Sequence, residues 1–118
     1  MSYDICLNDP KTGCVITFDE PIPVSGGTFA LGGTREAWLN VTYNYGSHYR
    51  RVMGEKGIRT VYGMTGKESL PVLDAAIDAL GDDVSSNYWD ATEGNAKAAL
   101  RNLALLAALA PHGVWDGD

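Results

Sequence analysis

The 118-residue sequence is poor in cysteine, and its basic residues are outnumbered by acidic ones, which narrows the classes of protein it can represent. Its two cysteines, Cys6 and Cys14, flank the turn sequence NDPKTG out of register for a bridge across a hairpin, so two free thiols are expected. Nine basic against fifteen acidic residues give a net charge of −6. This balance argues against direct nucleic-acid binding, because non-specific binders need a basic face.

Long apolar runs are also missing. No stretch reaches the roughly 18 apolar residues of a membrane span, and the start MSYDICLN has no basic region followed by an apolar run. We therefore expect neither a membrane segment nor a signal peptide, and together with the free thiols this predicts a cytoplasmic protein. The length and the ordinary apolar content predict one domain over residues 1–118.

Signatures of catalysis and metal binding are absent as well. His48 and His112 lack the spacing of a zinc site, and no G-x-S-x-G elbow or C-x-x-C pair occurs. No nucleophile, base and orienting group can be named together. The sequence therefore predicts a protein that is not an enzyme and that holds no metal and no cofactor.

Residues that favour β-strands dominate the first third of the chain. YDICL and CVITF, separated by a turn with Asp9-Pro10 and Gly13, predict a hairpin, and FAL between two GGT turns (26–28 and 32–34) predicts a short strand. Apolar residues then alternate with polar ones over residues 39–45, as in a strand with one buried face. A short helix is expected near 47–53, and GIRTVYG predicts a strand or a turn.

Helical periodicity dominates the last half. Thr65 and Glu68 have capping-box spacing before the first long helix, although Pro71 favours a start nearer Glu68. Thr92 is the expected N-cap of the second helix, which Pro111 ends. These elements predict an α+β fold with an N-terminal antiparallel sheet of four or five short strands, two longer helices on one face and one short helix.

The second half of the last helix, LALLAALA, has no polar face. A helix that is apolar all round is buried on every side. Two interpretations remain open: the helix is wrapped by its own sheet, or part of it meets another copy of the chain in a homo-oligomer.

The richest stretch of side-chain chemistry is AWLNVTYNYGSHYRR, residues 37–51, followed later by NYWDATEGN, residues 87–95. Their amides, rings and cations suit a small polar ligand with a base to stack and a phosphate to pair. The helix N-terminus near Asn95 is a further anion site. Packing and capping at a sheet–helix junction explain the same residues equally simply. The candidate ligand-binding residues are Asn40, Tyr43, Asn44, Tyr45, His48, Arg59, Trp89 and Asn95.

A resemblance covers residues 37–118. At LNVTYNYGSHYRRVMGEKGIRTVYG, at SLPVLDAAIDAL and at YWDATEGNAKAAL…PHGVWDGD, with NVTYNY and GNAKAAL as its core, the chain resembles small proteins of unassigned function from tailed bacteriophages and prophages. The resemblance implies a cytosolic protein of an infected bacterial cell and brings no catalytic residues. Small phage proteins of this size often antagonise host defence, and sponge proteins of the anti-Thoeris and anti-CBASS kind do so by sequestering a nucleotide signal.

Two functions follow as the main hypotheses, and a third, an enzyme acting on a nucleotide, has the least support. The first is a non-catalytic binding protein that holds a nucleotide-like ligand near residues 40–48. The second is a protein–protein inhibitor whose acidic surface covers a basic groove on a host defence enzyme such as a CRISPR nuclease.

Overall fold

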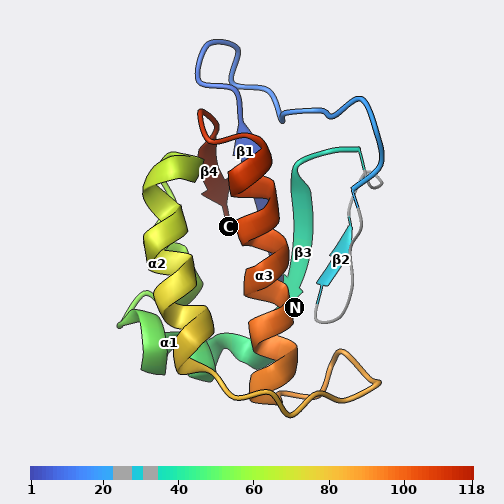
Figure 1. Cartoon of the computed structure of the whole chain (residues 1–118), viewed down its shortest axis with the longest axis vertical. Helices are drawn as coiled ribbons and strands as arrows, with labels where there is room; N and C mark the ends of the chain where they lie inside the picture. Colours follow the sequence, from blue (N-terminus) through green and yellow to red (C-terminus); the bar gives the residue numbers. More distant parts are fainter. Residues whose placement is uncertain (23–27, 31–34) are drawn as a thin grey trace.

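A four-stranded antiparallel sheet forms one layer of the structure, and the helices pack on one of its faces (Figure 1). The computed structural model describes residues 1–22 and 35–118, and the backbone of residues 28–30. β1 (Ser2–Asn8) lies between β3 (Trp38–Thr42) and β4 (Val114–Gly117), and β2 (Thr28–Ala30) pairs with the other edge of β3. The predicted α+β class is confirmed.

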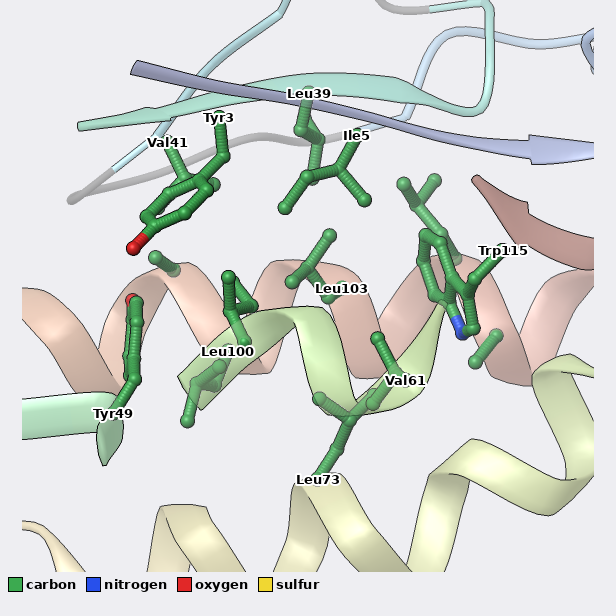
Figure 2. Packing of buried hydrophobic residues seen from close by; sticks show 14 of the residues in the cluster. Tyr3, Ile5, Leu39, Val41, Tyr49, Val61, Leu73, Leu100, Leu103 and Trp115 are labelled. Carbon is green, nitrogen blue, oxygen red and sulfur yellow. The ribbon is translucent and has the colours of Figure 1, made fainter. Parts of the chain in front are cut away.

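Alternation along β1 and β3 decides which face of the sheet is buried. Tyr3, Ile5 and Leu7 are at most 5% exposed. Tyr3 and Ile5 point toward the helices, as do Leu39 and Val41 (Figure 2). Successive side chains of a strand point to opposite faces, so the residues between them lie on the outer face and are only partly covered. The alternation read from the sequence therefore places the buried face of β3 correctly.

The strand predictions fail at two places. Residues 14–18 form only isolated bridges, Asn8 with Val15 and Thr17 with Glu36, instead of a regular strand. The strand expected over residues 39–45 ends at Thr42. The Thr42 side chain accepts a hydrogen bond from the backbone N–H of Asn44 and so caps the 3-10 helix η1 (Tyr43–Tyr45). The two GGT turns lie largely outside the described residues.

β4 was not predicted. Its Trp115 is 1% exposed, and the indole N–H donates to the Ser69 hydroxyl at 2.7 Å. The strand pairs with β1 from Ile5 to Asn8, so the end of the chain completes the sheet begun by its start.

The helices follow the capping signals of the sequence. The short helix α1 (Gly46–Met53) is confirmed, whereas GIRTVYG forms the 3-10 helix η2 (Gly57–Val61) and no strand. α2 (Gly66–Ala79) begins directly after Thr65, and both hydrogen bonds of the Thr65–Glu68 capping box are present. The expected later start at Glu68 is wrong, because the helix accommodates Pro71 in its interior.

α3 (Glu93–Leu109) lies between the sheet and α2, and Thr92 caps it as expected by accepting from the Asn95 amide. Leu100 and Leu103 are fully buried in the core (Figure 2). The sheet and α2 do not cover the whole helix, since Leu109 is 52% exposed.

Candidate functional site

The connection between α2 and α3, residues 80–92, is the longest connection between regular elements that the structure describes in full. We call it the α2–α3 loop. It runs past the first turn of α3 at one end of the molecule, at the bottom of Figure 1. Connections of about 12 residues or more are uncommon in small domains and often carry function. The α2–α3 loop is therefore a candidate functional site.

Side chains from elsewhere in the chain hold the backbone of this loop. The carbonyl oxygens of five consecutive residues, 87–91, each accept a hydrogen bond from a side chain. In order of acceptor, the donors are Asn95, Tyr45, Asn44, Asn95 and His48. For Asn95, Asn44 and His48 the distances are 2.8–3.1 Å. An exposed loop would normally leave such carbonyls to water, so this backbone is unusually constrained.

The protonation states of two donors follow from these contacts. Burial raises the pKa of Tyr45 to about 12, so its hydroxyl keeps the proton that it donates to the Tyr88 carbonyl. A carbonyl can only accept, so Nε2 of His48 carries the proton opposite Ala91. Its Nδ1 is then the acceptor for the Arg51 guanidinium, 3.3 Å away.

The first residues of α3 hold the other half of the loop. The Gly94 amide donates to the Asp83 carbonyl, and the Asn95 side chain accepts from the Ser85 amide at 3.1 Å. The buried Lys97 donates to the Leu80 carbonyl at 3.2 Å and pairs with Asp82 at 2.8 Å. The run EGNAK at the start of α3 thus fixes the path of the loop.

Two further details show how closely the loop is fitted. A Cβ on Gly94 would lie 2.5 Å from the Asp83 carbonyl oxygen, so no side chain fits there. Glu93 binds Arg51 at 2.9 Å and accepts from the Gly81 amide, and these two hydrogen bonds lower the pKa of its carboxyl. The Glu93 carboxylate therefore connects α3 with α1 and with the loop.

The loop presents apolar and aromatic side chains to solvent. Val84 is 71% exposed and Trp89 is 45% exposed. The rings of Tyr88 and Trp89 lie 4.9 Å apart and are tilted against each other. A large aromatic side chain on a rigid backbone is a common energetic anchor of protein interfaces.

Charge is strongly segregated around the loop. Residues 68–96 contain seven acidic residues and no lysine, arginine or histidine, whereas the rest of the chain has nine basic and eight acidic residues. Asp78 lies in the last turn of α2 and Asp82 and Asp83 follow it, at the end where the helix dipole disfavours negative charge. Asp82 pairs with Lys97, so Asp78 and Asp83 are the acidic residues that break this local rule and are candidates for a role other than stability.

The eight candidate residues from the sequence do not converge on one pocket. Five of them meet at the α2–α3 loop: Asn44, Tyr45, His48, Trp89 and Asn95. Four of these five use their side chains to hold the loop backbone; Trp89 instead carries the exposed ring. For these four, the structure shows contacts within the chain, and the ligand contact stays a prediction.

The other three candidates lie elsewhere. Asn40 is on the outer face of the sheet, where its amide donates to Ser2 and to Asp4 at 2.7 Å. The Arg59 guanidinium lies 4.9 Å from the ring centre of Tyr3 and 5.8 Å from that of Tyr43, and its Nε donates to the Asp118 carbonyl at 2.8 Å. These contacts orient the guanidinium of the exposed Arg59, away from the loop.

Sequence reasoning missed Gly94 and Lys97 as residues that build the loop. The available signal was the 13-residue interval between the end of α2 and the start of α3. Within the described ranges, no three histidine, cysteine or acidic side chains lie together in a way that could hold a metal ion. Nor does any described helix have the length and apolarity to cross a membrane.

Comparison with known proteins adds no family. No protein-family model, curated protein or solved structure matches the chain. The function must therefore be inferred from the geometry of the chain itself.

Proposed function

We propose that this chain is a non-catalytic binding protein that engages a partner protein through the α2–α3 loop. The proposal rests on one observation: five consecutive loop carbonyls accept hydrogen bonds from side chains, and Trp89 in the same segment is exposed to solvent. A loop ordered before binding loses little conformational entropy on association, so its binding energy is not spent on folding.

The surrounding charge selects the kind of partner. The acidic segment 68–96 favours a basic protein surface, and opposite charges speed association and exclude wrong partners. Taken with the resemblance to phage proteins, this makes a basic nucleic-acid groove on a host defence enzyme the target we propose. The protein would then act in the cytosol of an infected bacterial cell.

The test compares wild-type protein with Trp89→Ala in affinity capture from a bacterial host lysate, followed by mass spectrometry. We expect a basic protein that the wild type retains and the variant loses, because removal of an anchor side chain typically costs about 2 kcal/mol or more of binding free energy. The thermal midpoint should stay unchanged, since the ring is 45% exposed. Lys11→Ala, at an exposed residue of the turn after β1, is the control. Equal retention by all three proteins would refute the proposal.

A phosphorylated, nucleotide-like ligand at Arg59 is the second candidate. Tyr3, Tyr43 and the Asp118 carbonyl orient the guanidinium, while its terminal nitrogens form no hydrogen bond with a described residue. A planar cation held in this way suits a phosphate. Mass spectrometry of small molecules released from purified protein tests it: a nucleotide present in wild type and depleted in Arg59→Ala supports it, and none in either protein rejects it.

A further inference from the structure

A groove lies along the C-terminal half of α3. This half is at the opposite end of the helix from the α2–α3 loop (Figure 1). It measures about 530 Å³ and is lined by residues 18–22 together with Leu105 and Leu109. Beside it, Ala104, Leu105, Ala108 and Leu109 form a partly exposed apolar stripe on α3. The two alanines leave room for another helix to approach closely.

Three exposed charges accompany this groove. Asp19 and Glu20 lie in its wall, and Arg101 stands one turn before Leu105 on α3. None of the three side chains forms an ion pair with another residue in the described part of the chain. The face therefore carries both an apolar stripe and exposed charges of opposite sign.

We propose that the occupant of the groove is the α3 helix of a second copy of this chain, packed antiparallel with the two-fold axis at Leu105. In that register Arg101 of one copy lies opposite Leu109 of the other, because the two positions are equally far from Leu105. Leu109 lines the groove, so each Arg101 meets the acidic wall formed by Asp19 and Glu20 of the other copy. A two-fold dimer makes every such contact twice.

This inference goes beyond the proposed partner binding and does not depend on it. The dimer face lies at the C-terminal half of α3, whereas the partner loop lies at its N-terminus (Figure 1). A dimer would present two α2–α3 loops and so increase the avidity for a partner with repeated sites. Loss of either property leaves the other measurable.

Sedimentation equilibrium of the full chain at micromolar concentrations tests the proposal. We expect wild type to dimerise and Leu109→Glu to raise the dimer dissociation constant by about tenfold or more, since a charge replaces an apolar contact. Val84→Glu, which adds the same charge at an exposed apolar residue of the α2–α3 loop, should dimerise like wild type. Circular dichroism confirms that each variant is folded.

A charge exchange tests the register. Arg101→Glu alone, and Asp19→Arg with Glu20→Arg, should each weaken the dimer, and combining all three substitutions should restore it. A wild-type monomer would overturn the proposal and assign the groove to a partner of different sequence. A dimer that ignores Leu109→Glu would place the interface elsewhere, and failure of the combined variant to recover would overturn the antiparallel register.

Discussion

Asn95 shows how much a single residue contributes to the α2–α3 loop. It is 2% exposed, its amide and carbonyl oxygen bind Asn87, Asp90 and Ser85, and its own backbone N–H is capped by Thr92. Buried amides are stable only when their hydrogen bonds are satisfied, so the loop and Asn95 require each other. Asn95 therefore stabilises the loop, whereas the sequence predicted a ligand contact for it.

Gly94 gives the sharpest residue-scale prediction. In a helix, alanine is favoured over glycine by up to about 1 kcal/mol, yet a Cβ here would lie 2.5 Å from the Asp83 carbonyl oxygen. We expect Gly94→Ala to destabilise the protein by about 1–3 kcal/mol in urea unfolding, as overpacking does. Gly81→Ala is the control, because its Cβ would meet only atoms at 3.6 Å or more. A stabilised Gly94→Ala would contradict this account.

The two cysteines should react at different rates. Both are free, Cys14 is exposed, and burial together with the Asp116 carboxylate raises the pKa of the Cys6 thiol. The thiolate is the reactive form, so at neutral pH an alkylating reagent should modify Cys14 at least about threefold faster than Cys6. The Cys6 rate should rise as the pH approaches its raised pKa. Mass spectrometry of timed samples measures both, and Cys14→Ser should remove the fast phase; equal rates would count against the half-buried position of Cys6.

At the scale of elements, α2 and α3 are marked out by their caps rather than by helix propensity alone. Thr65 and Thr92 each accept from the third helical amide, and in α2 the Glu68 side chain completes a capping box. These signals are local, so the helix starts were readable from the sequence. Pro71, six residues into α2, is the one feature that argued against the observed start.

Pro71→Ala should stabilise α2. Proline in a helix interior removes one backbone hydrogen bond, here to the Lys67 carbonyl, and crowds the preceding turn. We expect a gain of about 1–3 kcal/mol and a higher thermal midpoint, since Pro71 is exposed and little packing is lost. Pro111→Ala, in the turn after α3, should give no such gain. Destabilisation by Pro71→Ala would mean that the ring itself contributes to the fold.

At the scale of the whole molecule, the acidic segment and the apolar groove lie at opposite ends of α3. The acidic segment 68–96 includes the N-terminal end of this helix and the loop beside it, and the apolar groove borders its other end. Opposite ends of one helix can thus serve different contacts. Arg51 of α1 adjoins the acidic loop and limits its repulsion through the Arg51–Glu93 pair.

Acid should weaken the whole fold through its paired carboxylates. Hydrogen bonds with Arg51 and with Lys97 lower the pKa of Glu93 and of Asp82. A carboxyl whose pKa is lower in the folded state contributes stability above its unfolded pKa, and that contribution is lost as the pH falls through the lower folded value. The free energy of unfolding should therefore decline below pH 4.5, the ordinary glutamate value.

The variant Glu93→Gln tests this linkage. It should be less stable than wild type at neutral pH, and its stability should depend less on pH below 4.5. Glu55→Gln, at an exposed glutamate that forms no ion pair with a described residue, is the control and should follow the wild-type curve. Parallel curves for wild type and Glu93→Gln would show that the Arg51 pair contributes nothing measurable.

The sequence by itself determined the parts of this protein that depend on neighbours two to four residues apart. Alternation set the buried face of β1 and β3, capping residues set the starts of α2 and α3, and composition set the acidic charge. Such signals act within one helix or strand and do not depend on the rest of the fold.

Only the tertiary structure decided what the polar residues of the candidate site contact. Asn44 donates to the Trp89 carbonyl 45 residues away, and Trp115 reaches Ser69 across 46 residues. The pairing of β4 with β1 likewise joins the two ends of the chain. A side-chain amide can serve a ligand, a cap or a distant loop equally well, and only packing in three dimensions selects among them, because the choice depends on which backbone groups the fold brings within hydrogen-bonding distance.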